Sequence, residues 1–580
     1  MARTLAFGSR FWKCWPVLSF RPRLLECLRD YSRERFIADT LAGLTVGIVA
    51  LPLAIGLGIA SGVSPGAGIY TAIIGGFLVS ALGGSRVQIG GPAGAFVGLV
   101  YLLIAQHGLP NLLVCTAIAG VCLFILGALK LGTLIKYVPH PVTTGFTCGI
   151  AITIMSTQVK DLLGLDLAVV PPEFIDRTLA QVRTFPTLSW PTVIVGVGAI
   201  VLIKTWPRRW RRWVPGSIVA VVLGTAAVRL LDLPVATIAS RFGHDAFPSG
   251  LPSFAAPTFD WDTLGQLIRP AFALTLLGAI ESLLSAVVAD GMIDDRHDSN
   301  QELMAQGVAN FVVPFFGGIP VTGVIARTAT NVRNGATSPV AGIVHAGTLL
   351  MIVLIAAPLA RHIPLAVLAA VLVMVAFNMG EWSEFRLLRR QTKSDAAVFL
   401  VTFVLTVLFD LTVAVEIGML LAAGLFIKRV TDTTQVAMLD EGTGTGEGHE
   451  HVARLPRGVL VYRVFGALLF GAADKLDTVL RRAGADTKVV VLHMAPVTAL
   501  DATALNALER LHAKLQRHKK HLVLSGPHTQ PYFVMERAGF LDRVGADNIA
   551  ADLPSAIARA EQLLAQGGSE PTFAPATTPP

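Results

Sequence analysis

The 580-residue chain has few charged residues and few cysteines. Asp, Glu, Lys and Arg make up 15% of it, against about 25% in soluble globular proteins. Its cysteines show no CxxC or other metal-ligand spacing, which argues against a disulfide framework and against a zinc site; they are Cys14, Cys27, Cys115, Cys122 and Cys148. The sequence also lacks the pattern of a hydrolase triad or of a phosphate-binding glycine loop, so we expect neither an enzyme nor a cofactor.

Hydrophobic residues are correspondingly abundant, at 53% of the chain. They occur in runs of about 18 to 25 residues, the length of a helix that crosses a bilayer, and the chain has about fourteen such spans if two short ones are counted. The expected fold class is therefore a polytopic α-helical membrane protein. The net charge of +8 does not indicate nucleic-acid binding, because cytoplasmic loops of membrane proteins collect Lys and Arg.

Basic residues also predict the orientation. Residues 1–36 are rich in arginine and show no cleavable signal sequence, so we expect a cytoplasmic N-terminal segment followed by a transport domain at 37–430. With that start, even-numbered spans end in the cytoplasm, where basic clusters such as 208–212 and 386–393 fall. We expect a multi-pass protein of the bacterial inner (plasma) membrane with both termini cytoplasmic.

Two segments of small residues resemble each other within this apolar chain. The first is Gly90-Gly91-Pro92-Ala93-Gly94, and the second runs from Gly317 to Thr328, with Pro320 lying 228 residues after Pro92. Proline suits the first position of a helix, where an N–H group would have no partner. Each proline is therefore predicted to start a short helix, the third and the tenth. The offset and seven spans per copy predict an inverted repeat of seven plus seven spans.

The free N–H groups and partial positive charge of the two helix starts predict an anion site between them. Span 1, about 39–60, is expected to be broken at Pro52 beside this site. The glycines have a structural alternative, since small residues also allow close helix packing. The candidate substrate-binding residues are Pro52, Leu53, Pro92, Ala93, Gly94, Ala95, Phe96, Thr322, Gly323, Val324 and Arg327.

Two ionisable residues stand out in the apolar spans. Glu281 lies in the middle of span 8, where a carboxyl group is costly and functional by default. Low dielectric favours its protonated form, so it is the candidate for proton coupling; the alternative is a neutral acid that joins two helices. Arg327 is predicted about two turns into the tenth helix, where it would support the anion site or pair with Glu281. Its alternative role is a cytoplasmic anchor.

The composition changes after Lys428. Residues 431–458 form a polar linker, in which His449-Glu450-His451 is better explained as a solvated segment than as a metal site. Alternating strand-like and helix-like runs over 459–566 predict a small α/β domain. The Pro- and Thr-rich tail at 567–580 is predicted to be disordered.

Motifs along the chain resemble those of the SulP anion transporters over nearly its whole length. They are Asp39–Ile48, Gly90-Gly91-Pro92, Gly278–Leu284 and Pro314–Pro339. The resemblance implies core and gate domains that move in an elevator-like manner, an anion between the third, tenth and first helices, and a homodimer. It also implies a C-terminal cytoplasmic STAS domain that binds a protein partner. The loop that is phosphorylated in related regulators reads Leu500-Asp501-Ala502-Thr503, with alanine at the acceptor position.

Within that family, 278–292 and 331–339 most resemble the bacterial branch that takes up C4-dicarboxylates such as succinate and fumarate. Glu281 matches the position where proton-linked relatives carry Glu. Sodium-linked bicarbonate relatives carry Asp there with a hydroxyl residue one turn later, and Ser285 at that later position leaves Na⁺ open. We therefore expect a secondary active transporter for proton-coupled C4-dicarboxylate uptake. Transport of sulfate or bicarbonate, and a non-transporting membrane scaffold that signals through the STAS domain, are the alternatives.

Overall fold

The computed structural model describes residues 20–133, 138–167, 169–211, 214–243, 250–258, 263–409, 411–439, 455–469, 476 and 486–566. The chain divides into two compact units, Met1–Leu420 and Leu421–Pro580. Each unit has its own hydrophobic core. Most of the predicted linker, a helix predicted at 475–483 and the predicted disordered tail lie outside the described residues.

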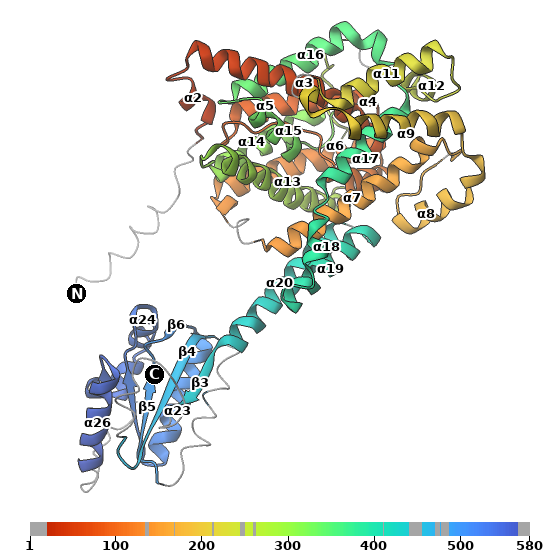
Figure 1. The fold of residues 1–580 in the computed structure, drawn as a ribbon. Coiled ribbons are helices and arrows are strands. Elements are labelled where there is room, and N and C mark those ends of the chain that lie inside the picture. Colours follow the sequence, from red (N-terminus) through yellow and green to blue (C-terminus); the bar gives the residue numbers. More distant parts are fainter. Residues whose placement is uncertain are drawn as a thin grey trace. The chain divides into compact units, whose positions relative to one another are not determined.

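The first unit is helical (Figure 1), as the long apolar runs of the sequence predict. A π-helical turn, Thr71–Gly75, joins α4 to α5 within the second span. The helices are α2 (Arg23–Cys27), α3 (Arg33–Ala60), α4 (Pro65–Tyr70), α5 (Gly76–Leu82), α6 (Phe96–Ala128), α7 (His140–Leu163), α8 (Phe174–Arg183), α9 (Trp190–Thr205), α10 (Arg208–Arg211), α11 (Gly216–Leu230), α12 (Ile238–Phe242), α13 (Leu264–Ile293), α14 (Ser299–Val312), α15 (Ile325–Arg333), α16 (Val340–Ala360), α17 (Leu365–Met379), α18 (Ser383–Leu387), α19 (Lys393–Leu408) and α20 (Leu411–Thr433).

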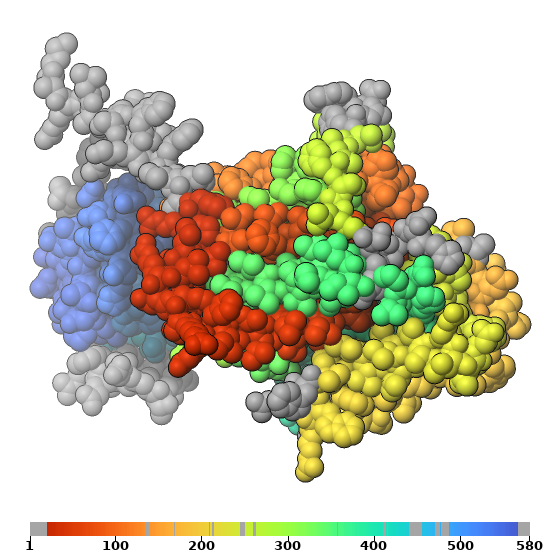
Figure 2. Space-filling model, turned by 90° about the horizontal axis from the view of Figure 1, so that it is seen from above, coloured from red at the N-terminus to blue at the C-terminus, as the bar shows by residue number. Residues whose placement is uncertain are grey.

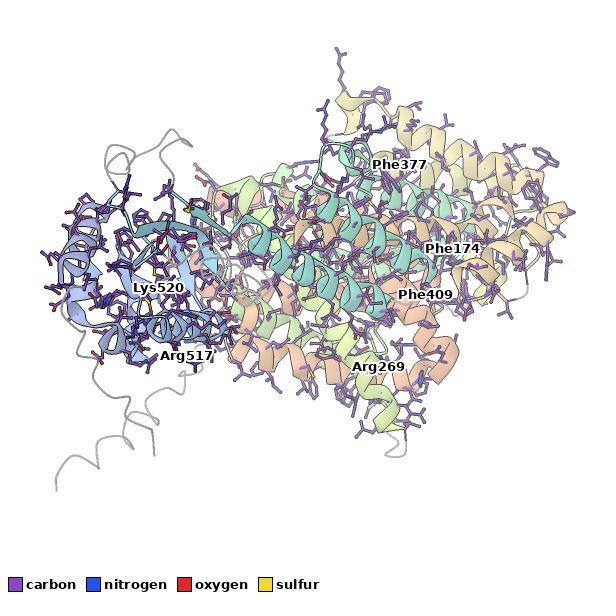
Figure 3. The ribbon with its side chains drawn as sticks, turned by 90° about the horizontal axis from the view of Figure 1, so that it is seen from below. Phe174, Arg269, Phe377, Phe409, Arg517 and Lys520 are labelled. Carbon is purple, nitrogen blue, oxygen red and sulfur yellow. The ribbon has the colours of Figure 1, made fainter. Side chains whose placement is uncertain are left out.

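Helix length and composition agree with a protein that crosses the membrane several times. Among the described residues, six helical segments are long and apolar enough to cross a bilayer, and three further apolar helices are shorter. Large apolar side chains remain exposed on these helices, including Phe377 at 54% and Phe409 just after α19 at 66% (Figure 3). Such a surface is unfavourable in water but suits the hydrocarbon of a bilayer.

The helices pack in two groups. In the first group, α6 packs against α13 and α14, and α3 packs against α16. Figure 2 shows α3 in red and α16 in green side by side on one face of the molecule. In the second group, α7 packs against α17 and α19, and α9 packs against α11 and α17. This division matches the core and gate groups that the family resemblance implies.

The structure corrects two expectations about proline. The predicted break at Pro52 is wrong: α3 runs through this residue without interruption. A proline removes only one backbone hydrogen bond of the helix, and α3 is held along its length by packing on α16. Pro92 and Pro320 also do not occupy first helical positions, because α6 begins at Phe96 and α15 at Ile325.

The residues before these two helices are extended instead. Gly90–Gly91 (β1) and Thr322–Gly323 (β2) pair as antiparallel strands, with Gly90 opposite Gly323 and Gly91 opposite Thr322. The extended backbone that this pairing requires excludes a helix at these positions. The third span ends where the backbone leaves the helical conformation at Gly108, and the chain then continues as the fourth span.

The second unit is an α/β sheet with helices. Its strands run in the order β3-β4-β5-β7-β8, and β6 also pairs with β4. The β3–β4 pair is antiparallel, whereas the β4–β5, β5–β7 and β7–β8 pairs are parallel. The elements are β3 (Gln435–Met438), β4 (Val459–Leu468), β5 (Val489–His493), β6 (Val497–Leu500), α23 (Ala502–Arg517), β7 (His521–Ser525), α24 (Thr529–Arg537), α25 (Phe540–Val544), β8 (Ile549–Ala550) and α26 (Leu553–Gln566).

Candidate functional site

The β1–β2 pair brings together the two small-residue segments that the sequence singles out. Both strands depend on glycine for close approach. A Cβ atom on Gly91 would lie 2.3 Å from Nη1 of Arg327, and one on Gly323 would lie 1.5 Å from Nε2 of Gln88. A larger residue at either position would therefore displace a buried polar side chain.

Buried polar side chains from other helices fix the segment before β2. Asn310 of α14 donates from Nδ2 to the Val321 carbonyl (2.7 Å) and accepts from the Val321 N–H at Oδ1 (2.9 Å). Thr71, in the π-helical turn, accepts from the Ile319 N–H (2.8 Å) and donates to the Ala67 carbonyl (2.7 Å). These bonds satisfy extended backbone that would otherwise be costly in a membrane.

One face of α13 is bonded to the same strands. Thr322 donates from Oγ1 to the Gly278 carbonyl (3.2 Å), and Gln88 donates from Nε2 to the Ser282 carbonyl (3.0 Å). Further along this face, Ser285 donates to Thr328 Oγ1 (3.2 Å), which accepts from the Ile89 N–H (3.1 Å). The strands and the part of α13 that carries Glu281 therefore form one connected structure.

Arg327 supplies the positive charge of the site. It is the third residue of α15, in the first turn rather than two turns in, and is only 2% exposed. Its Nη2 makes one long contact to the Pro92 carbonyl, at 3.5 Å, and its Nε and Nη1 have no hydrogen-bond acceptor among the residues that the structure describes. An uncompensated buried cation is costly, so this guanidinium favours an anionic partner.

Backbone donors lie close to this charge. The N–H groups of the first three residues of α15 have no acceptor within the helix, as at any helix start. At α6 the prediction is only partly correct, because the Phe96 N–H donates to the Ala93 carbonyl (3.2 Å) and proline at 92 has no N–H. The N–H groups of Gly94 and Ala95 make no hydrogen bond within the described chain.

Glu281 and Arg327 do not form the ion pair that the sequence allows. No described cationic group lies within ion-pair distance of Glu281, whose Oε2 is buried without a hydrogen-bond partner. The side chain as a whole is partly exposed. The described residues therefore hold Glu281 in no ion pair.

The apolar candidates of the site pack together. Leu53, Ala93, Ala95 and Phe96 belong to one hydrophobic cluster, which also contains Ile280, and the partly buried Val324 packs against it. Pro52 lies beside Leu53 in α3 and is buried. The Thr322 side chain, in contrast, is occupied by its bond to α13.

The second helix group covers this site. A Cβ atom on Gly94 would lie 2.7 Å from Cδ1 of Ile154 on α7 and 3.9 Å from the thioether of Met379 on α17. The site therefore lies where the two helix groups meet, so their relative movement would change access to it.

Sequence reasoning missed Gln88, Asn310 and Thr328, which hold the strands in place. The signal available for Gln88 was a lone amide between Val87 and Ile89, just before the paired glycines. His345 of α16 is fully buried, and neither of its ring nitrogens has a hydrogen-bond partner among the described residues.

Comparisons with known proteins place this architecture in a family. The sulfate permease family model matches residues 36–402, and the STAS domain model matches residues 451–556. The chain is 40% identical over 524 residues to the putative sulfate transporter YvdB of Bacillus subtilis, covering 89% of this chain and 96% of that protein. It is 29% identical over 538 residues to the bicarbonate transporter BicA of Picosynechococcus, covering 88% and 92%.

Solved structures show the same fold. The transmembrane domain of a cyanobacterial bicarbonate transporter BicA aligns with a TM-score of 0.60 at 29% identity, covering 68% of this chain and 99% of that one. The murine solute carrier 26 family member A9, in its inward-facing state, aligns with a TM-score of 0.82 over 97% of this chain and 96% of its own. Its identity is 17%, so this likeness concerns the fold alone.

Proposed function

The chain belongs to the sulfate permease family, and we propose that it is a secondary active transporter which binds a small oxyanion between α6 and α15 and couples its movement to a proton through Glu281. Membership of the family makes it a multi-pass anion transporter rather than an enzyme. The observation that carries the proposal is the buried Arg327, whose Nε and Nη1 have no acceptor in the described protein.

Binding would use two kinds of donor. Arg327 offers a planar guanidinium, which suits oxyanions because it can donate two parallel hydrogen bonds. Neutral donors come from the backbone. They are the free N–H groups at the start of α15 and those of Gly94 and Ala95. An anion held in this way is positioned by backbone, so its affinity depends on the β1–β2 pair that aligns the two segments.

Alternating access would come from the two helix groups. The anion site is built on α6, α13 and α15, whereas Ile154 and Met379 of the other group lie against Gly94. Sliding one group past the other would carry the bound anion across this apolar contact. This is the elevator-like movement that the family resemblance implies.

Glu281 is the proposed proton carrier. Its Oε2 has no partner, so the charged form has no compensating group nearby among the described residues. Binding a proton neutralises it, and a proton moving inward with an anion reduces the cost of carrying negative charge into a negative interior by about 2.3 kcal/mol per charge at 100 mV.

Sulfate, bicarbonate and a C4-dicarboxylate are the candidate substrates. The names of the relatives support sulfate and bicarbonate, whereas the motifs around Glu281 support a C4-dicarboxylate. All three carry the carboxylate or oxyanion oxygens that the guanidinium and N–H groups can bind.

We further propose a location in the bacterial inner membrane with both termini cytoplasmic, where the STAS domain meets its protein partner, and a homodimer. In the STAS unit, the Asp501 carboxylate accepts from the Ala504 N–H (2.8 Å) and caps α23, so the Asp501–Thr503 loop acts as a helix start here. Ala502 has no hydroxyl group that could accept a phosphoryl group.

The test is uptake into proteoliposomes under an inward proton gradient. Labelled sulfate, bicarbonate and succinate are compared in parallel, with wild type beside Glu281→Gln. Gradient-driven accumulation of one anion that the variant loses would support both the substrate and the coupling residue. Accumulation that requires a sodium gradient instead would replace the proton in the proposal, and no uptake of any anion would favour a scaffold that signals through the STAS domain.

A further inference from the structure

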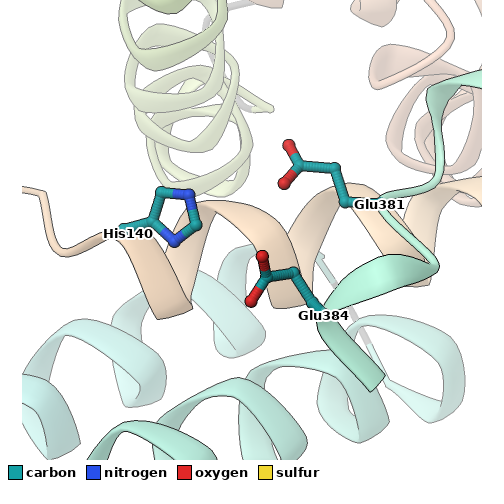
Figure 4. A group of neighbouring side chains, drawn as sticks. All are labelled: His140, Glu381 and Glu384. Atoms are coloured by element: carbon teal, nitrogen blue, oxygen red, sulfur yellow. The ribbon is translucent and has the colours of Figure 1, made fainter. Parts of the chain in front are cut away.

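A second group of ionisable side chains lies away from the anion site. His140 is the first residue of α7, Glu381 lies in the turn that follows α17, and Glu384 lies in the first turn of α18. Their ligand atoms all lie within 4.8 Å of one another. Figure 4 shows the imidazole and the two carboxylates converging from α7, the turn and α18.

The two carboxylates have no basic partner on a Lys or Arg side chain among the described residues. Two carboxylates this close repel each other, and a divalent cation would remove that repulsion. His140 and Glu381 are exposed and Glu384 is half-buried, so an ion can reach the group.

Neighbouring groups hold these ligands in position. Gln391 donates from Nε2 to Oε2 of Glu384 (2.6 Å). Trp382, between the two carboxylates, donates from Nε1 to the Phe377 carbonyl (2.7 Å), which fixes the turn. Thr144 donates to the His140 carbonyl (2.9 Å) at the start of α7. A metal ligand oriented by a second hydrogen bond is typical of functional metal sites.

We propose that His140, Glu381 and Glu384 form a binding site for a divalent transition-metal ion of the Zn²⁺ class. One imidazole and two carboxylates suit zinc and its neighbours in the first transition row, whereas Mg²⁺ and Ca²⁺ favour sites made of oxygen alone. Three protein ligands leave at least one position for water.

The site has a consequence for transport, which rests on the proposed function. A bound ion would join α7 to the end of α17, the two helices whose Ile154 and Met379 lie against Gly94. Met379 is the last residue of α17, immediately before the turn that carries Glu381. Zinc would therefore stiffen the surface past which the anion site moves and slow uptake.

Binding is tested first, on the full-length protein in nanodiscs. Zn²⁺ is titrated calorimetrically in a background with His449→Ala and His451→Ala, which removes the histidines of the linker. One site is expected, and His140→Ala or Glu381→Gln should weaken it more than tenfold. Gln391→Ala, which removes only the supporting hydrogen bond, should cost about tenfold. His362→Ala, which removes a half-buried histidine of this unit, should leave the affinity unchanged.

A spectroscopic variant protects the test against misfolding. His140→Cys should bind Co²⁺ with a thiolate-to-metal absorption band that wild type lacks, which shows that residue 140 is a ligand. Absence of zinc binding in wild type would overturn the proposal. So would unchanged affinity in both His140→Ala and Glu381→Gln, or the absence of the thiolate band in a folded His140→Cys protein.

The effect on transport is measured separately. Zinc should slow anion uptake by wild type and leave uptake by His140→Ala unchanged. If wild type transports no anion at all, the proposed function fails while the binding titration still decides the metal site. If zinc binds as expected but uptake does not change, the link between the metal site and the gate helices is wrong.

Discussion

Replacing Gly91 by alanine tests the position of Arg327 without substituting any charged residue. A Cβ atom at this position would lie 2.3 Å from Nη1 of Arg327. Real Cβ contacts are longer by about an ångström or more, so the guanidinium must move away from the β1 strand. Because Arg327 is buried, it has no open solvent into which to swing.

The expected loss of anion affinity follows from the role of the displaced guanidinium as the charged partner of the anion. Losing one partner of a buried, hydrogen-bonded charge pair costs about 2–5 kcal/mol. Each 1.4 kcal/mol changes an affinity by about tenfold, so the Gly91→Ala protein should bind its anion at least about tenfold more weakly. Crowding in a packed interior also costs about 1–3 kcal/mol of stability, so a lower melting temperature should accompany the change.

The matched control is Gly347→Ala. This glycine lies within α16, where a Cβ atom would meet no other group within 4 Å. Alanine is favoured over glycine in a helix by about 0.5–1 kcal/mol, so this variant should be as stable as wild type or more so and transport normally. Uptake kinetics in proteoliposomes and thermal unfolding in detergent measure both effects. A Gly91→Ala protein with the anion affinity of wild type would refute the placement of Arg327 in the site.

Three further predictions follow from other parts of the structure. Glu281→Gln should keep exchange of anion across the membrane but lose accumulation driven by a proton gradient, as counterflow and gradient-driven uptake compared on one preparation would show. Asp39→Ala should destabilise the first unit by about 1–3 kcal/mol, because the buried carboxylate accepts hydrogen bonds from Tyr31, Thr337 and Ser338; an unchanged melting temperature would contradict this. Burial, with the charges of Arg463 and His528, lowers the pKa of His493 in the second unit. The unfolded chain therefore binds a proton first, and calorimetry should show this unit losing stability as the pH falls below about 6.5, a loss that His493→Gln should reduce.

The sequence predicts most of the membrane helices because the constraint is local. A bilayer requires a run of apolar residues, and such runs are visible without knowing what each helix packs against. Because these predictions use local sequence alone, they fail where contacts with a distant helix decide the structure. Pro52 was read as a break from its residue type alone, whereas packing of α3 on α16 keeps the helix continuous.

The site itself depends on contacts between distant residues. Gln88 bonds to the carbonyl of Ser282, and Thr71 bonds to the N–H of Ile319. No pattern in the sequence indicates that Gln88 would bond to Ser282 or Thr71 to Ile319. The prolines at 92 and 320 pointed to the right segments for an incorrect reason, since it is strand pairing of the neighbouring glycines that brings these segments together.

Asp39 caps a segment that is distant from it in the chain. An acidic residue near the start of a span predicts a cap for its own helix. In the structure the carboxylate instead accepts from the N–H groups of Thr337 and Ser338, which precede α16. The capping chemistry was predictable, but the helix that receives it was not, because the two segments are almost three hundred residues apart in the chain.

The central claim is that Arg327 binds the transported anion, and a binding titration tests it most directly. Sulfate, bicarbonate and succinate are titrated calorimetrically into the protein in nanodiscs, with wild type beside Arg327→Met and Arg327→Lys. We predict one saturable site for at least one of the anions, weakened more than about tenfold by methionine and less by lysine, which keeps the charge but loses the planar donor pair. Equal affinity in wild type and a folded Arg327→Met protein would contradict the account.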